Sequence, residues 1–287
     1  MKIGITGATG QLGRLVVKYL KEKVSADQIV ALARTLEKAS DLGVEVRKFD
    51  YNKPEVMSEA LKGVDKLLLI SASEIGARVR QHANVIEAAK NAGVSYIAYT
   101  SLLRADKSSL SLADEHLETE KLIKNSGIPF TILRNGWYTE NYTGSISDVI
   151  DHEVLLGSSG EGKISSATRA DYALAAATVV TREGLDGKTF ELAGDEFFTL
   201  SDMAAEISRQ TGKNIVYKNL PADEYAQALI KAGTPEGYAQ FFAGTHISTE
   251  KGDLFDDGHH LSQLTGKPTT TLSQAIKQAL THIQQYH

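Results

Sequence analysis

The sequence predicts an α/β protein with a doubly wound, mostly parallel β-sheet and a smaller α/β lobe towards the C-terminus. Short apolar runs alternate with longer stretches in which apolar residues recur at helical spacing. Some of the short runs, such as residues 67–70, are apolar throughout, as in parallel strands that are covered on both faces. Turn residues separate the two kinds of segment: Gly63, Gly93, Gly127 and Pro129 each fall between an expected helix and the next expected strand.

The elements can be placed in chain order. After a first strand near the N-terminus, apolar runs predict strands at residues 29–33, 44–48, 66–70, 96–100 and 130–133, and helical spacing predicts helices around residues 12–20, 54–61, 77–92 and 112–125. Right-handed crossovers between such strands give the doubly wound topology. Beyond them we expect a loop at 157–164, a helix at 171–181, a strand at 190–192, helices at 201–211, 222–232 and 235–243, a turn at 254–260 and a last helix at 271–283. We predict a core at residues 1–134 and a smaller lobe on the substrate side at 135–287, with some segments returning to the core.

Composition excludes several classes of function. The 287 residues carry a net charge of −5, which argues against a broad basic surface and therefore against a nucleic-acid partner. The chain has no cysteine, so thiolate chemistry and cysteine-based metal sites are excluded. No apolar run approaches the roughly 18 residues of a membrane span, and the chain opens directly on a strand, so we expect a cytoplasmic protein without membrane contact. The DDGHH run at 256–260 is interpreted as a turn because adjacent side chains diverge, and no metal site is predicted.

Three glycines with GxxGxxG spacing link the first strand to the first helix. Gly7 allows a sharp turn, Gly10 allows the backbone to approach a pyrophosphate, and Gly13 allows the helix to pack closely on the strand. The helix start then offers free N–H groups and the positive end of its dipole to phosphates. The alternative is a tight strand-to-helix turn with no ligand. We interpret the segment as the dinucleotide-binding turn of a Rossmann core.

The residue after the second strand indicates which dinucleotide binds. Arg34 lies 21 residues beyond Gly13, where NAD-binding proteins carry the acidic residue that holds the ribose hydroxyls. A guanidinium can bind a 2′-phosphate through two charge-assisted hydrogen bonds, so the sequence predicts NADPH as cofactor, unless Arg34 is an ordinary surface arginine. Lys38 either adds positive charge or is a solvated lysine. Asp50 either accepts from the adenine amino group or caps the turn before Pro54.

Four segments resemble the atypical short-chain dehydrogenases of the NmrA-like group: residues 7–13 (GATGQLG), 99–101 (YTS), 133–141 (LRNGWYTEN) and 167–172 (ATRADY). The resemblance covers essentially the whole chain and is greatest to bacterial members that reduce quinones with NADPH. It implies that the glycine loop, the arginine after the second strand, an SxSE segment, a GWYxEN segment and one further arginine contact NADPH. In this sequence those residues are Gly7, Ala8, Thr9, Gly10, Gln11, Leu12, Arg34, Ser71, Ala72, Ser73, Glu74, Gly136, Trp137, Tyr138, Thr139, Glu140, Asn141 and Arg169.

The aromatic residues of the GWYTEN segment suit a flat ligand. The segment follows the strand at 130–133, at the carboxyl edge of the sheet, where open α/β sheets bind ligands. Trp137 and Tyr138 offer rigid planar surface on which a flat acceptor can stack beside nicotinamide. For Trp137 the alternative is an aromatic cover over the edge of the core. Phe241 and Phe242 either pack the smaller lobe or line the acceptor pocket.

The chain lacks the Tyr-xxx-Lys pair with which ordinary short-chain dehydrogenases protonate an alkoxide. The helix that follows Ser101 carries HLETEK at 116–121 in its place. Reduction of a quinone yields a delocalised hydroquinone anion of low basicity, so a strong proton donor is dispensable. Water, Tyr138 or His116 can complete protonation, and His116 is otherwise a solvated or capping histidine. Ser101 either bonds nicotinamide or acceptor or is simply a polar strand end.

We therefore predict flavin-independent reduction of quinones by NADPH, through hydride transfer to a small-molecule quinone held beside the cofactor. The alternative is a non-enzymatic redox sensor that binds NADP(H) without turnover. A carbonyl reductase is disfavoured because no proton donor for it can be identified. The sequence leaves a monomer and a homodimer equally open and does not name the physiological quinone.

Overall fold

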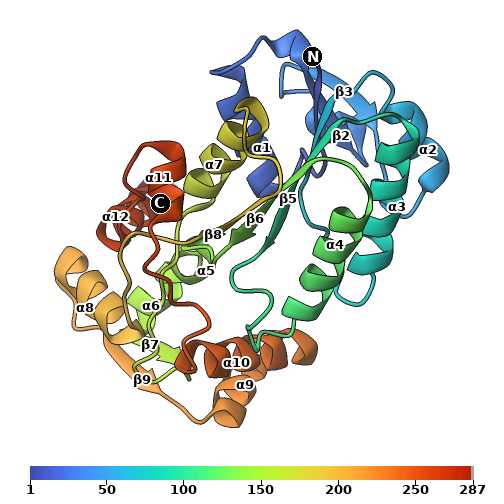
Figure 1. Ribbon diagram of the computed structural model, residues 1–287. Helices are drawn as coiled ribbons and strands as arrows, with labels where there is room; N and C mark the ends of the chain where they lie inside the picture. Colours follow the sequence, from blue (N-terminus) through green and yellow to red (C-terminus); the bar gives the residue numbers. More distant parts are fainter. Residues whose placement is uncertain (286–287) are drawn as a thin grey trace.

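A seven-stranded, wholly parallel sheet forms the centre of the computed structural model, which describes residues 1–285 (Figure 1). The strands lie in the order β3-β2-β1-β4-β5-β6-β8, and every neighbouring pair is parallel. Their bounds are β1 Ile3–Ile5, β2 Ile29–Ala33, β3 Glu45–Lys48, β4 Lys66–Leu69, β5 Tyr96–Leu102, β6 Phe130–Asn135 and β8 Lys188–Leu192. The strand order reverses between β1 and β4, and this switch point opens a crevice at the carboxyl ends of the strands.

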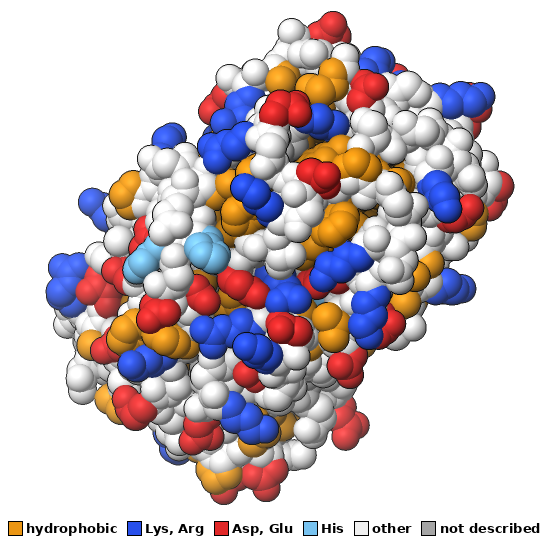
Figure 2. Space-filling model, in the orientation of Figure 1, with side chains coloured by type: hydrophobic (Ala, Val, Ile, Leu, Met, Phe, Trp, Pro, Cys, Tyr) orange, Lys and Arg blue, Asp and Glu red, His pale blue; other side chains and the backbone are white. Residues whose placement is uncertain are grey.

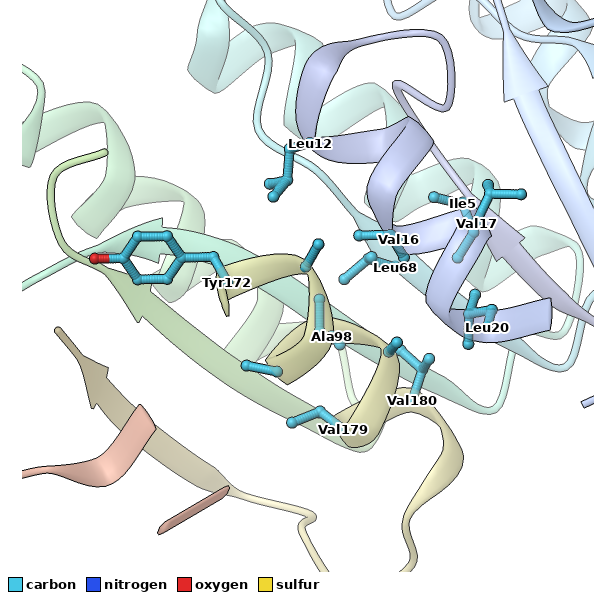
Figure 3. Packing of buried hydrophobic residues seen from close by; sticks show 14 of the residues in the cluster. Ile5, Leu12, Val16, Val17, Leu20, Leu68, Ala98, Tyr172, Val179 and Val180 are labelled. Carbon is cyan, nitrogen blue, oxygen red and sulfur yellow. The ribbon is translucent and has the colours of Figure 1, made fainter. Parts of the chain in front are cut away.

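Helices cover both faces of this sheet. One face carries α1 (Gln11–Lys21), α7 (Arg169–Thr181) and α11 (His260–Thr265), and the other carries α2 (Pro54–Ala60), α3 (Arg78–Asn91) and α4 (Ala113–Asn125). Two short 3₁₀ segments, η1 (Ala26–Gln28) and η2 (Leu36–Ala39), flank β2. Figure 3 shows α1 and α7 side by side over the sheet, with Val16 and Leu20 of α1 near Val180 of α7. The alanines of α7 leave room for this close approach.

The smaller lobe is built around a two-stranded parallel sheet of β7 (Val154–Gly157) and β9 (Val216–Asn219). Its helices are α5 (Glu140–Thr143), α6 (Ile146–His152), α8 (Leu200–Thr211), α9 (Ala222–Lys231), α10 (Glu236–Glu250) and α12 (Leu272–Gln285). In Figure 1 the lobe lies opposite β2 and β3 across the sheet. It has its own apolar core, in which Ile146, Met203 and Ile276 are almost fully buried.

The predicted fold class is confirmed, and the predicted elements of the core lie within a few residues of those observed. Three features of the lobe were not predicted: the β7–β9 sheet, the short helices α5 and α6, and the continuation of α10 to Glu250 rather than residue 243. His260, placed in a turn, begins α11. The β9 strand is short and mostly exposed, so it has no apolar run that predicts a strand. The division of the chain at residue 134 stays a prediction; that residue lies within β6.

Candidate functional site

A groove of about 510 Å³ lies at the carboxyl ends of β1 to β4. Its lining comes from the ends of these four strands and the turns that follow them, from the start of α1, from one residue of α3 and from two residues of the chain beyond β6. The lining residues are Gly7, Thr9, Gly10, Gln11, Leu12, Gly13, Leu32, Ala33, Arg34, Phe49, Asp50, Tyr51, Asn52, Ile70, Ser71, Ala72, Ser73, Glu74, Gln81, Tyr138 and Arg169. Twelve of the eighteen predicted cofactor contacts are among them, so the structure brings most of the predicted set to one place.

The glycine turn has the geometry that its spacing predicts. Gly7 has φ +58°, a left-handed conformation that favours glycine. A Cβ atom on Gly13 would lie 2.2 Å from the Gly7 carbonyl oxygen, so only glycine lets α1 start this close to β1. Gly10 is the N-cap of α1 and offers no side chain to the first N–H groups of the helix. Those donors are free for a phosphate at the groove.

Arg34 supplies the positive charge that the sequence predicts for the groove. Arg34 follows β2 directly, is solvent exposed and lines the groove. Lys38 is exposed in η2 and is not among the lining residues. Asp50 accepts the N–H of Asn52 at 2.9 Å, which is the turn-capping role, and its carboxylate also lines the groove.

Tyr138 and Arg169 also line the groove, and Tyr138 follows β6, which lies on the other side of the switch point from β2. The Arg169 guanidinium lies 4.4 Å from the centre of the Tyr138 ring, within the range of a cation–π contact. Burial raises the pKa of Tyr138, while the charge of Arg169 acts in the opposite direction. The Glu140 carboxylate accepts the backbone N–H of Arg169 at 2.9 Å and so fixes the start of α7. Two side chains that offer a planar surface and a positive charge therefore face the same space.

Six of the predicted contacts lie outside the lining: Ala8, Gly136, Trp137, Thr139, Glu140 and Asn141. Thr139 and Glu140 instead line a larger cavity of about 850 Å³ beneath α12. The Trp137 ring lies 6.4 Å from that of Phe241 and packs with the apolar cluster around Leu102 and Leu254, as in the alternative of an aromatic cover. Phe241 therefore packs between the lobe and the core, whereas the Phe242 side chain is 39% exposed.

His116 is buried and not exposed to solvent. The interpretation as a solvated or capping histidine is wrong, because His116 is 95% buried on the inner face of α4 and its Nδ1 lies 2.6 Å from the Tyr99 hydroxyl. Burial, followed by the nearby charge of Arg78, lowers the pKa of His116 to about 3. The side chain is therefore neutral near pH 7, and it is not among the residues that line the groove.

A buried charge cluster joins β6 to α4, the helix that carries the HLETEK segment at 116–121. Arg134 on β6 makes two hydrogen bonds of 2.9 Å to the carboxylate of Glu120, which lies on α4 four residues after His116. The same guanidinium donates to Asp106 at 2.6 Å and to Glu191 at 2.8 Å. The Ser101 hydroxyl donates to Glu120 at 2.7 Å, so Ser101 is more than a polar strand end and its proton is held inside the protein.

The Glu120 and Arg134 side chains of this cluster stay ionised. Burial alone would raise the pKa of the Glu120 carboxyl, but hydrogen bonds from Arg134 and Ser101 keep it below its usual value. The bonds to Glu120 also raise the pKa of Arg134. Neither side chain can serve as a proton donor near neutral pH.

Sequence reasoning missed several groove residues. Phe49, Tyr51 and Asn52 surround the one residue predicted after β3, and Gln81 reaches the groove from α3. Phe49, Tyr51 and Asn52 could have been found because they follow a predicted strand. No sequence signal marks Gln81, whose Nε2 donates to Glu74 at 2.9 Å only in the folded chain.

Within residues 1–285 no group of three or more histidine and carboxylate side chains is arranged to hold a metal ion. In the DDGHH run, Asp256 pairs with Arg104 while His259 lies 3.3 Å from Asp195. No helix in the described part of the chain is both long and apolar enough to cross a bilayer. On the face shown in Figure 2, acidic and basic side chains are intermingled around an apolar hollow.

A model of the NmrA-like family matches residues 1–285. The chain belongs to the NmrA-like family. This NmrA-like chain is 53% identical to "Quinone oxidoreductase 2" of Escherichia coli (strain K12) over 277 residues, which cover 96% of this chain and 97% of that protein. The resemblance seen in the sequence motifs is thereby confirmed.

Solved structures agree with this assignment. The crystal structure of the E. coli NADPH-dependent quinone oxidoreductase QOR2 complexed with NADPH matches with a TM-score of 0.95 and 52% identity, covering 97% of this chain and 99% of that one. The Citrobacter sp. triphenylmethane reductase complexed with NADP(H) matches with a TM-score of 0.94 and 41% identity, covering 97% and 100% of the two chains.

Proposed function

We propose that this NmrA-like protein reduces quinones with NADPH by direct hydride transfer, without a flavin. The observation that carries the proposal is the groove itself, in which a glycine turn, an exposed arginine after β2 and the Tyr138–Arg169 pair lie along one crevice. The 53% identity to an E. coli quinone oxidoreductase supports it. When bound, NADPH supplies the hydride.

The residues of the groove fit the parts of NADPH in order. The free N–H groups at the start of α1 suit the pyrophosphate, because no side chain caps them and Gly13 lets α1 begin close to β1. Arg34 suits the 2′-phosphate at the adenosine end. Tyr138 and Arg169 also line the groove, where they would position the nicotinamide and a flat acceptor.

The acceptor class follows from the proton balance. A quinone that takes a hydride from NADPH, which becomes NADP+ as that C–H bond breaks, is reduced by two electrons to a hydroquinone anion, and this anion takes up one proton afterwards. Glu120 and Arg134 hold fixed charges, and His116 is neutral and away from the groove lining. An acceptor whose reduced form is a weak base needs no acid stronger than water or the Tyr138 hydroxyl.

Triphenylmethane cations are a second candidate acceptor. Hydride addition to such a cation gives a neutral product and needs no proton, so it suits a site without a strong acid. The specific observation is the 41% identity to a triphenylmethane reductase over 97% of the chain. Both acceptors would use the same bound NADPH.

The test is NADPH oxidation by purified, flavin-free protein, followed by nicotinamide absorbance with benzoquinones, naphthoquinones and a triphenylmethane dye, and with NADH in parallel. We expect turnover with NADPH preferred. Saturable NADPH binding without turnover of any acceptor would contradict the reductase and favour the redox sensor. The cytoplasmic location and the choice between monomer and homodimer stay predictions.

A further inference from the structure

The loop between β4 and α3, residues 71–77, forms one wall of the groove. Ser71 to Glu74 line the groove directly. The backbone of the loop is bound by side chains from other elements: the Ser71 N–H donates to Thr100 Oγ1 at 2.9 Å, the Ala72 N–H donates to His82 Nε2 at 2.8 Å, and the Gly76 N–H donates to Glu115 Oε1 at 2.8 Å. A loop with so many fixed backbone groups is ordered before any ligand arrives.

An ion pair between α3 and α4 supplies the Gly76 bond and a further bond to the loop, from Arg78 to Ala72. Arg78 Nη1 donates to Glu115 Oε2 at 2.8 Å, and the two side chains are only 5% and 16% exposed. Arg78 Nε donates at the same time to the Ala72 carbonyl oxygen at 2.8 Å. Because the guanidinium is planar, these two bonds fix its orientation, and each partner of the pair also binds loop backbone.

His82 binds the Ala72 N–H from the interior of the protein. Its Nε2 accepts the Ala72 N–H, so the ring proton lies on Nδ1, which donates to Thr119 Oγ1 at 2.9 Å. Thr119 donates in turn to the Glu115 carbonyl oxygen. Burial, followed by the charge of Arg78, lowers the pKa of His82 to about 3, so the ring stays a neutral acceptor at physiological pH.

We propose that Arg78, Glu115 and His82 are positioning residues that hold the 71–77 wall of the groove in its cofactor-binding position. None of the three is among the described residues that line the groove, so each acts through the loop. Without them the loop would have to be ordered when the dinucleotide binds, and that cost would weaken binding. The identity of the dinucleotide as NADPH rests on the proposed function.

The first experiment removes the ion pair without leaving a buried charge. In the double variant Arg78→Met, Glu115→Leu the apolar replacements are expected to keep the fold, which the melting temperature checks. We expect the NADPH dissociation constant to rise about tenfold or more while kcat at saturating NADPH stays within about twofold of wild type. Glu118→Gln, on the exposed side of the same helix, is the matched control and should bind NADPH as wild type does. A dissociation constant for the folded double variant within about twofold of wild type would overturn the proposal.

The second experiment substitutes His82, and it tests the proposal even if the double variant does not fold. His82→Gln retains a carbonyl oxygen for the Ala72 N–H, whereas His82→Ala does not, so we expect NADPH binding close to wild type in the first and clearly weaker in the second. Hydrogen exchange of the cofactor-free wild type should show protected amides at Ala72 and Gly76; free exchange at both would overturn the proposal. NADPH binding is measured by fluorescence without quinone, so loss of quinone turnover alone would defeat only the proposed reaction.

Discussion

The groove and the buried charge cluster handle charge in opposite ways. In the groove, the first N–H groups of α1 have no side-chain cap and Arg34 is exposed. In the cluster, Arg134 is shared among three carboxylates and Glu120 is completely buried. The chain thus leaves donors free where an anionic cofactor is proposed to bind, and it pairs its buried charges with one another in the cluster. The contrast agrees with the proposed acceptors, whose reduced forms are weak bases and need no strong acid.

The largest effect on stability is expected from a substitution that breaks the charge cluster. Arg134→Met would leave Glu120 buried with only Ser101 and Lys124 as polar partners, so we expect a loss of about 3–5 kcal/mol in the free energy of unfolding. Urea denaturation measures it. Arg209→Met, which removes an exposed arginine from its ion pair with Glu206, is the matched control and should leave the free energy of unfolding almost unchanged. Adding Glu120→Gln to Arg134→Met should recover part of the loss, and no recovery would contradict the account.

The contrast also explains what the sequence could predict. The glycine turn and Arg34 are local features, since each position is set by its distance along the chain from a strand. The cluster joins α4, β5, β6 and β8 through Glu120, Ser101, Arg134 and Glu191, which lie up to 90 residues apart. No local pattern marks such partners. For the same reason the sequence did not predict that His116 is buried.

The next prediction tests the close approach in the groove. Gly13→Ala would put a Cβ atom 2.2 Å from the Gly7 carbonyl oxygen and 2.8 Å from Ala8 Cα, and backbone atoms cannot move aside as a side chain can. We expect a loss of stability of about 3 kcal/mol and at least tenfold weaker NADPH binding. Gly10→Ala is the control, because its nearest contact would be 3.3 Å and the unbound protein should keep most of its stability. Equal stability of the two variants would contradict the geometry.

A substitution at Arg34 tests whether the exposed charge in the groove binds the 2′-phosphate. Arg34→Asp places a carboxylate where the 2′-phosphate is proposed to lie, so NADPH binding should weaken by about 2 kcal/mol while NADH binding changes little. Fluorescence titration with each cofactor gives the two dissociation constants. Lys38→Asp is the control for a general loss of positive charge, since Lys38 is exposed and outside the groove lining. An equal loss for NADPH and NADH in Arg34→Asp would disprove the assignment.

The smallest expected effect is a pH dependence of stability that comes from the buried histidine His116. The pKa of His116 is lowered to about 3 in the folded protein, against an ordinary value near 6.5 when unfolded. As pH falls below about 6.5, the unfolded chain binds a proton that the folded chain does not, so the free energy of unfolding falls by about 1.4 kcal/mol per pH unit for this histidine. The loss continues until the folded pKa is reached. Urea denaturation between pH 7 and 5 should therefore show a shallower slope for His116→Asn than for wild type, and identical slopes would mean that His116 takes up its proton in the folded state as readily as in the unfolded chain.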